Sequence, residues 1–272
     1  MDNENNEPKQ LTDDEIDWEA FFNPEDKKEW EKEKLQKKKR KRFMVKIVSS
    51  LLVLALLISG LEVWINIFNL PAINFVKVSN QLSKQPEVKE YKKSVVTIEW
   101  DGTKGTGFTV TADGLIVTNE HVVDRTNRVN VHFKSGDAYI GKVVAKHPEI
   151  DVAIVKIDGE NLPFLPLAFN QYWEKWIGEE IIFIGNPLAF TQIANQGKII
   201  GKAHLTDWEV PVMMIEAPIY KGNSGSPVLN QNGEVVGVIF ATLQNPELET
   251  KEIVGIAIPS HYIKEIVDSI SE

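Results

Sequence analysis

The pattern of hydrophobic and polar positions changes twice along this chain and divides it into parts. Charged residues dominate the first part, the middle is almost wholly apolar, and short apolar runs alternate with turn residues from Val88 onward. A long unbroken apolar run predicts a membrane-spanning or buried helix, whereas short runs between turn signals predict strands. We therefore expect a charged segment at 1–42, partly disordered or helical, an apolar helix at 43–68, a linker at 69–90 and a β domain at 91–272.

The β domain is predicted from ten or more short runs that are rich in Val, Ile, Thr and Phe. Turn signals break these runs every 8 to 12 residues, and no helical pattern separates them. This arrangement indicates antiparallel barrels rather than a parallel sheet. One helix is expected at the end, where apolar residues recur at helical spacing after Pro259. The hairpin signals are Ala112-Asp113-Gly114, Ser135-Gly136 and Asn232-Gly233.

The apolar middle part is long enough to cross a bilayer. No charge occurs from Ile47 to Leu61, and Phe43 to Trp64 is 22 residues, about 33 Å of helix against roughly 30 Å of bilayer hydrocarbon. A buried core helix would be more amphipathic, and a cleaved signal peptide would have a short basic head and a small-residue cleavage site. The pattern favours a single membrane anchor in contact with the lipid bilayer.

The charge before this anchor changes sign abruptly. Residues 1–26 carry ten acidic side chains against Lys9, and 27–46 carry eleven basic ones. Asn23 and Pro24 are typical of a helix start. Basic residues flanking a membrane span usually stay on the cytoplasmic side, so the run Lys37–Arg42 predicts a cytoplasmic N-terminus and places everything after residue 70 outside.

Composition excludes several classes of function. The 272 residues are 43% hydrophobic and 25% charged, with a formal net charge of -9, which argues against nucleic acid as a partner. The absence of cysteine excludes disulfides, thiolate metal sites and cysteine nucleophiles. We expect no metal site and no cofactor.

One short loop carries candidate chemistry. In "KGNSGSPVL", residues 221–229, Ser224 lies between two glycines ahead of an apolar run. Gly, Asn, Ser and Pro are also the ordinary residues of turns, so this stretch alone fits a plain turn as well as a nucleophile. A serine needs a base, and the base needs a carboxylate to hold its tautomer.

The sequence offers one good partner of each kind. Of the five histidines, His121 alone follows a buried-looking strand and a polar turn, in "LIVTNEHVVD". Asp151 alone among the aspartates directly opens a strongly apolar strand, in "KHPEIDVAIVKI". The order His, Asp, Ser differs from that of subtilisin-type enzymes and of α/β-hydrolases, and only the chymotrypsin-like double barrel combines it with an all-β chain.

Residues 105–267 resemble the protease domain of the HtrA/Deg family of trypsin-like serine proteases. The blocks are "GTGFTVTADGLIVTNEHVV", "HPEIDVAIVKI", "IGNPLAF" with "QGKIIG", and "IYKGNSGSPVLNQNGEVVGVIFA" with "VGIAIPS". The resemblance implies an all-β fold of two six-stranded antiparallel barrels with a C-terminal helix. It also implies His121 as general base, Asp151 as its orienting partner and Ser224 as nucleophile.

The same resemblance assigns the rest of the site. The backbone N–H groups of Gly222 and Ser224 would bind the oxyanion, and Pro218, Ile219 and Tyr220 would line the substrate pocket. Because no carboxylate occurs from Ala217 to Leu229, we expect cleavage after small or medium aliphatic residues.

Three features differ from common relatives. Ser226 replaces the second glycine usual in the family, which leaves the resting shape of the loop open, and Asn223 cannot pair with a freed N-terminus, so activation by trimming is not expected. With 48 residues after Ser224, no PDZ domain is expected, and a homotrimer is implied by resemblance alone.

Two functions remain open at this point. The first is a membrane-anchored endopeptidase that cuts unfolded or damaged proteins outside the cytoplasm. The second is a catalytically silent protease-fold protein that binds peptides or takes part in signalling. The intact set of three side chains favours the first.

Overall fold

The computed structural model describes residues 24–67, 70–170, 172–187, 190–206, 208, 210–244 and 253–271. The chain divides into two units, 1–69 and 70–272. In the first unit a single helix, α2 (Pro24–Ile67), joins the basic and the apolar stretches without a break. Its start agrees with the expected Asn23-Pro24 signal, although Asn23 lies outside the described residues.

The span Lys28–Ser59 within α2 is long and apolar enough to cross a membrane, by length and composition alone. It is the only such helix in the described part of the chain. Its apolar side chains are exposed, with Leu56 at 71%. Burial against other described residues therefore does not account for the apolar composition of this helix.

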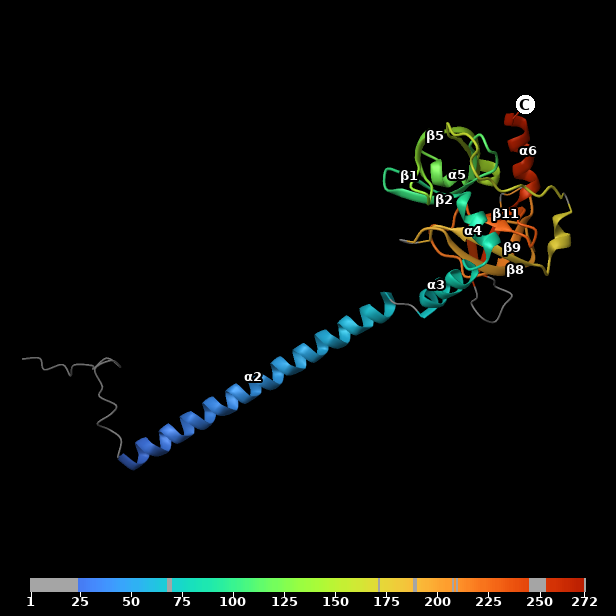
Figure 1. Ribbon diagram of the computed structural model, residues 1–272. Coiled ribbons are helices and arrows are strands. Elements are labelled where there is room, and N and C mark those ends of the chain that lie inside the picture. The colour runs from blue at the N-terminus through green and yellow to red at the C-terminus, as the bar shows by residue number, and fades with distance from the viewer. Residues whose placement is uncertain are drawn as a thin grey trace, which may run out of the picture. The chain divides into compact units, whose positions relative to one another are not determined.

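The second unit is built on two closed antiparallel barrels (Figure 1). The first has the strand order β1-β2-β3-β6-β5-β4 and the second the order β10-β11-β12-β9-β8-β7. The prediction of two six-stranded barrels is confirmed. The first barrel comprises β1 (Val95–Trp100), β2 (Thr103–Thr109), β3 (Leu115–Thr118), β4 (Arg128–His132), β5 (Ala138–His147) and β6 (Val152–Lys156). The second comprises β7 (Glu180–Gly185), β8 (Ile193–Ala203), β9 (Val212–Glu216), β10 (Pro227–Leu229), β11 (Val235–Gln244) and β12 (Ile253–Pro259).

The strands follow the hydrophobic pattern. In β4 the two valines are buried, and the residues beside them are exposed, as a period of two requires. Strand β3 is buried along its whole length. The three predicted hairpin glycines adopt positive φ, at +97° for Gly114, +103° for Gly136 and +78° for Gly233. Their lack of a side chain permits these turns.

Two helices occupy most of the stretch that was expected to be a linker. They are α3 (Leu70–Leu82) and α4 (Pro86–Lys93), and α3 runs beside β8 (Figure 1). Phe75 of α3 is buried, and the hydroxyl of Ser79 accepts a 3.0 Å hydrogen bond from the N–H of Ala194. Within its unit, the segment is therefore packed against the second barrel. The domain boundaries otherwise stay a prediction.

One hydrophobic core joins the barrels to the flanking helices. It contains Val88 of α4, Phe108 and Ile154 of the first barrel, Leu229 of the second, and Ile263. Ile263 belongs to α6 (Ser260–Ser271), the C-terminal helix that was expected after Pro259. This shared core fixes the two barrels against each other, so loops from both can meet at one site.

Candidate active site

His121 lies on a short helix that is anchored on the first barrel. Strand β3 ends at Thr118, and α5 (Glu120–Val123) follows at once. Val122 and Val123 are buried, and the carbonyl of Val122 accepts a 2.6 Å hydrogen bond from the Trp100 indole N–H. The imidazole itself is half exposed, at 48% of the side chain. The helix is thus held while the ring stays accessible.

Asp151 holds the imidazole from the neighbouring strand. It follows the short helix η1 (Pro148–Ile150) in a left-handed conformation, with φ of +52°, and β6 begins directly after it. One carboxylate oxygen accepts the backbone N–H of His121 at 2.9 Å, and the other lies 2.7 Å from Nδ1 of the ring. Nδ1 is thus oriented as the donor, which leaves Nε2 free to accept a proton.

The charge of Asp151 also tunes His121. The hydrogen bond to Asp151 raises the pKa of His121 above its ordinary value, against an opposing effect of burial. The charges of Asp151, Glu120 and Asp124 act in the same direction as the hydrogen bond. A carboxylate that stabilises the imidazolium strengthens the ring as a proton acceptor.

Ser224 lies beyond a tight turn of the second barrel. The turn spans Tyr220 to Asn223, and the N–H of Asn223 donates to the carbonyl of Tyr220 at 3.0 Å. Gly222, its third residue, has a φ of +98°. A positive φ at this position defines a type II turn, which reverses the central peptide relative to type I.

Two N–H groups of this loop are left without a partner. Asn223 and Gly225 donate their N–H groups to Tyr220 and Ile239. Those of Gly222 and Ser224, in contrast, donate to no described residue. Unpaired N–H groups two residues apart on a tight turn are the form that an oxyanion hole takes.

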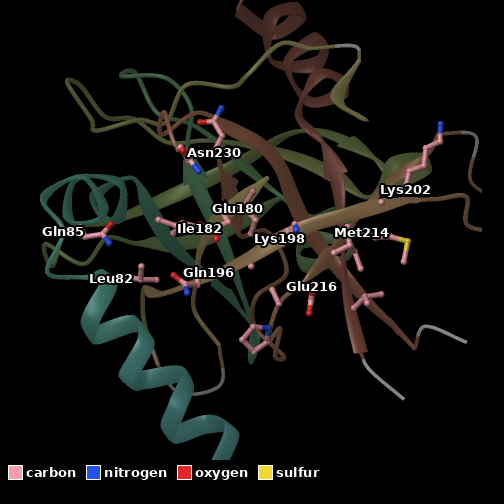
Figure 2. Close-up of a pocket in the computed structure, with 18 residues that line it drawn as sticks. Leu82, Gln85, Glu180, Ile182, Gln196, Lys198, Lys202, Met214, Glu216 and Asn230 are labelled. Atoms are coloured by element: carbon pink, nitrogen blue, oxygen red, sulfur yellow. The ribbon is translucent and has the colours of Figure 1, made fainter. Parts of the chain in front are cut away.

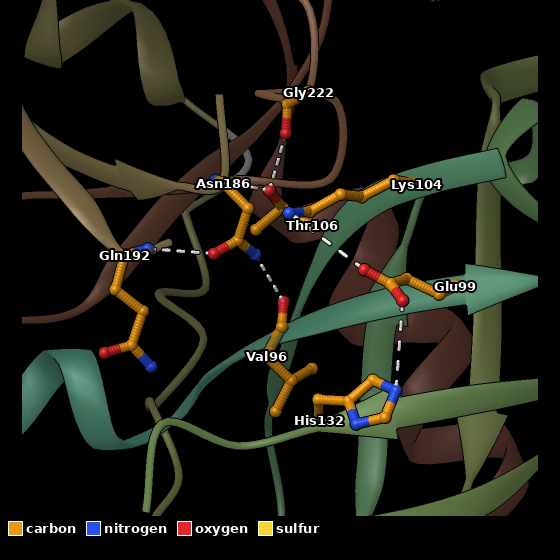
Figure 3. A network of polar contacts seen from close by, with 8 residues as sticks. All are labelled: Val96, Glu99, Lys104, Thr106, His132, Asn186, Gln192 and Gly222. Atoms are coloured by element: carbon orange, nitrogen blue, oxygen red, sulfur yellow. Dashed lines mark hydrogen bonds and ion pairs between the residues drawn. The ribbon is translucent and has the colours of Figure 1, made fainter. Parts of the chain in front are cut away.

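Thr106, a residue that sequence reasoning missed, ties this loop to the first barrel (Figure 3). Its hydroxyl donates to the carbonyl of Gly222 at 2.7 Å and accepts the N–H of Asn186 at 2.9 Å. Its own N–H donates to the carbonyl of Ser224 at 2.9 Å. In "GTGFTV" a threonine between glycines looks like any strand residue, so only the contact across the barrels reveals its role.

Asn186, in the segment after β7, connects Thr106 to another strand of the first barrel by further hydrogen bonds. The side-chain amide of Asn186 donates to the carbonyl of Val96 at 2.8 Å and accepts the N–H of Gln192 at 2.8 Å (Figure 3). All three of these residues are fully or nearly fully buried. The nucleophile loop therefore rests on a buried polar frame that joins both barrels.

The approach of Ser224 to the first barrel requires Gly225. Its φ is +84°, and a Cβ at this position would overlap the carbonyl oxygen of Thr106. The hydroxyl of Thr118 lies at the same spot, three residues before His121. The loop of Ser224 therefore lies beside the end of β3, from which α5 and His121 follow. The hydroxyl of Ser224 makes no hydrogen bond with a described residue, and such bonds often form only with substrate.

Comparison with known proteins agrees with this geometry. Residues 105–238 match the family described as a trypsin-like peptidase domain. A probable periplasmic serine endoprotease, DegP-like, of Chlamydia trachomatis serovar D is 37% identical over 174 residues, which cover 62% of this chain and 34% of that protein. A protein of the same description from Pseudomonas fluorescens is 37% identical over 136 residues, 49% of this chain and 28% of the relative.

A solved structure extends the likeness to the fold. The serine endoprotease of Yersinia pestis aligns with a TM-score of 0.58 and 27% identity over 67% of this chain and 64% of that one. The chain is similar to the HtrA/Deg family of trypsin-like serine proteases. It spans about a third of the length of the curated relatives that it matches.

The departure from the HtrA/Deg pattern at Ser226 is accommodated by a glycine opposite. Ser226 and Asn223 are both fully buried. A Cβ on Gly185, at the end of β7, would overlap Oγ of Ser226 and lie 2.5 Å from Oδ1 of Asn223. Neither side chain has a polar partner among the described residues. The serine therefore fits without opening the turn.

The three expected pocket residues lie in different surroundings. Pro218 is exposed, and Ile219 is half-buried against Gly255 of β12, where a Cβ would overlap its Cδ1. Tyr220 packs edge-on against Phe75 of α3, with ring centroids 4.8 Å apart. Their role in binding substrate stays a prediction.

A groove of about 1270 Å³ lies on the outer face of the second barrel (Figure 2). Its walls come mainly from outward-facing residues of β7, β8 and β9, and Leu82 of α3 lies at one end. Pro218 lines it, whereas His121, Asp151 and Ser224 do not. The groove therefore contains none of the three proposed catalytic residues, and it meets the expected substrate pocket only at Pro218.

Three further histidines, His132, His147 and His261, lie at strand ends or in the last helix. His261 opens α6 and is buried, which lowers its pKa, and His132 and His147 end β4 and β5. In the described part of the chain, no three His, Cys, Asp or Glu side chains are grouped so that they could hold a metal ion.

Proposed function

We propose that this chain is a serine endopeptidase in which His121, Asp151 and Ser224 form the catalytic triad. The observation that carries the proposal is the 2.7 Å contact of His121 Nδ1 with Asp151. The end of β3, from which His121 follows, lies beside the loop in which the N–H groups of Gly222 and Ser224 have no partner among the described residues. His121 Nε2 takes the proton of Ser224 as Oγ attacks the substrate carbonyl carbon. The imidazolium then protonates the leaving amine, and water hydrolyses the acyl-enzyme.

The N–H groups of Gly222 and Ser224 would stabilise the negative oxygen of the tetrahedral intermediate. They are preorganised, because the turn is closed by its own hydrogen bond and Thr106 holds the carbonyls of Gly222 and Ser224. Loss of one such donor typically costs about 2.7–4 kcal/mol of transition-state stabilisation. Catalysis therefore depends on the shape of this loop as much as on the three side chains.

A fluorophosphonate probe tests the proposal on the full-length chain. The wild-type protein should be labelled, Ser224→Ala should lose both labelling and casein cleavage, and Ser135→Ala, on an exposed turn of the first barrel, should keep both. Labelling of Ser224→Ala at the wild-type rate would assign the nucleophile elsewhere. A wild-type protein that takes up no probe would favour the catalytically silent binding protein.

The substrates we propose are unfolded or damaged polypeptides outside the cytoplasm. An apolar specificity pocket would accept apolar substrate side chains. Because folded proteins bury most of these side chains, they are exposed mainly in unfolded chains. The relatives named above are described as periplasmic, which supports an extracytoplasmic protease domain. A homotrimer is part of the proposal, and sedimentation of the full chain in detergent tests it.

We also propose that α2 anchors the chain in a membrane with residues 1–42 in the cytoplasm. The basic run Lys37–Arg42 supports this orientation, because cytoplasmic flanks carry an excess of Lys and Arg. Protease added to intact spheroplasts should digest residues 71–272 and spare an N-terminal tag. Loss of the tag in intact spheroplasts would reverse the orientation.

A further inference from the structure

A second cavity, of about 630 Å³, lies where α4, the β4–β5 turn and Pro163 meet. It shares no lining residue with the outer groove, and it meets the polar frame behind the candidate active site only at Gln192. Its volume lies in the range of about 300–1,000 Å³ that is typical of small-molecule sites. Nothing in the proposed proteolysis uses it.

The cavity has a strong excess of positive charge. Four lysines line it, three from α4 and Lys134 from the β4–β5 turn, against Asp137 as the one lining carboxylate. Asp137 already accepts a 2.7 Å hydrogen bond from Ser135. Among the α4 lysines, Lys93 pairs with Glu90 at 2.7 Å. Lys89, Lys92 and Lys134 form no ion pair with a described residue.

Lys92 is the unusual member of this set. It is only 7% exposed, and its ammonium donates one hydrogen bond, of 2.6 Å, to the hydroxyl of Ser83. The other two donors have no partner among the described residues. Burial, and next the charge of Lys134, lowers the pKa of Lys92 to about 8. A buried ammonium without a counter-ion destabilises the fold, so it calls for an explanation other than stability.

The other side chains that line the cavity include an apolar group and the buried amide of Gln192. Phe133, Leu162 and Pro163 give one side of the cavity an apolar surface. Gln192, 3% exposed, donates its side-chain N–H to the carbonyl of Val95 at 2.5 Å. Its Oε1 is buried and accepts from no described residue. The cavity thus offers cations and an apolar wall.

We propose that this cavity binds a phosphate monoester that carries an apolar group, with Lys92 as its central contact. A monoester has a charge of about −1.5 to −2 at pH 7 and three strong acceptor oxygens, which matches three lysines without ion-pair partners. Its organic part contacts the apolar wall. A soluble ester and the headgroup of a lipid share this chemistry.

Titration calorimetry on the full chain in nanodiscs of zwitterionic lipid tests the proposal. Phenyl phosphate should bind with one site per chain, inorganic phosphate at least about tenfold more weakly, and phenol not at all, because a charged hydrogen bond and an apolar contact each contribute. Lys92→Met and Lys134→Met should each weaken phenyl phosphate binding at least about tenfold. Lys142→Met, an exposed lysine of β5 outside the cavity, should leave it unchanged.

Stability separates loss of the site from loss of the fold. Lys92→Met exchanges an unpaired buried charge for an apolar side chain, so the unliganded melting temperature should stay or rise. Phenyl phosphate should raise the melting temperature of the wild type and not that of Lys92→Met. No binding to the wild type, or equal affinity in both cavity variants, would overturn the proposal.

A further arm separates the two sources of the ligand. Phosphatidic acid in the discs should compete with phenyl phosphate if a lipid headgroup occupies the cavity. If only soluble esters reach it, the same discs should leave the affinity for phenyl phosphate unchanged.

Discussion

The hydroxyl of Thr106 in the first barrel donates a 2.7 Å hydrogen bond to the carbonyl of Gly222 in the second. The N–H groups of Gly222 and Ser224 have no partner among the described residues. A residue of one barrel thus holds the proposed oxyanion loop of the other. The N–H of Thr106 also donates to the carbonyl of Ser224. The two contacts hold the loop on both sides of Asn223.

We expect Thr106→Val to lower kcat about ten- to a hundredfold with little change in KM, because a small misplacement of the reacting groups costs about that much. The substitution is nearly isosteric, and it leaves the Gly222 carbonyl and the Asn186 N–H without their partner. Steady-state cleavage of a fluorogenic peptide measures the effect. Thr106→Ser keeps the hydroxyl and should retain most of the activity. Equal kcat for the valine variant and the wild type would show that this bond does not position the loop.

The pH dependence of cleavage should report the environment of His121. Because Asp151 raises the pKa of His121, and because only the neutral ring accepts a proton, the acid limb of kcat/KM should lie above about pH 6.5. Glu120→Gln should move the limb to lower pH, since the charge of Glu120 contributes to the raised pKa. Glu160→Gln, an exposed change outside α5, should not move it. If the acid limb of kcat/KM stays at the same pH in Glu120→Gln, the result would contradict the assignment of this limb to His121.

The stability contribution of the same group has the opposite pH dependence. A pKa raised in the folded state stabilises the fold below the unfolded pKa, and that contribution is lost as the pH rises through the folded value. His121 therefore contributes to stability where it is protonated and to catalysis where it is neutral. Activity should rise over the same pH interval in which this contribution fades.

The strands could be predicted from sequence because half-buried strands alternate with a period of two. Strand β4 shows the alternation directly, with Val129 and Val131 buried between exposed neighbours. The helices α3 and α4 were missed, because a short segment with mixed polarity resembles a linker until it packs, as α3 does on β8 and α4 on β1. Their burial is tertiary, as with Phe75 against Tyr220.

The residues of the site also fall into two groups, those that the sequence indicates and those that only the structure reveals. His121, Asp151 and Ser224 could be proposed from the sequence because the chemistry requires those residue types in that chain order, and their role stays a prediction. Thr106 could not be found, since its role arises from a contact between residues that are 116 positions apart. The fit of Ser226 was left open for a related reason, because it depends on Gly185 of another strand.

Gly225 and Gly136 form a matched pair of glycines with positive φ. Their φ values are +84° and +103°, but a Cβ on Gly225 overlaps the carbonyl of Thr106, whereas one on Gly136 meets nothing within 4 Å. Gly136→Ala should cost about 1–2 kcal/mol of unfolding free energy from its backbone alone and keep activity. Gly225→Ala should cost more and abolish cleavage. Denaturant unfolding and peptide cleavage together measure both, and an active Gly225→Ala would contradict the close approach.

Substrate choice should depend on Ile219, which lies over Gly255 of β12. No carboxylate occurs from Ala217 to Leu229, so an arginine inserted there would be a buried charge without a partner, which costs several kcal/mol. Val, Ala or Leu would gain up to about 1.5–3 kcal/mol from burial. We therefore expect the wild type to cut a denatured protein after small and medium aliphatic residues, as mapped by mass spectrometry.

Ile219→Ala should enlarge this pocket and move the cuts toward Leu and Phe. The kcat/KM ratio of a Phe peptide over a Val peptide should rise at least about tenfold, because each added methylene group in an apolar pocket contributes about 1–3 kcal/mol to discrimination. Ile177→Ala, an exposed change that follows the short helix η2 (Trp173–Trp176), should leave the ratio unchanged. A wild type that cuts mainly after Lys or Arg would show that the specificity pocket lies elsewhere, because the apolar surface of Ile219 offers such side chains no counter-charge.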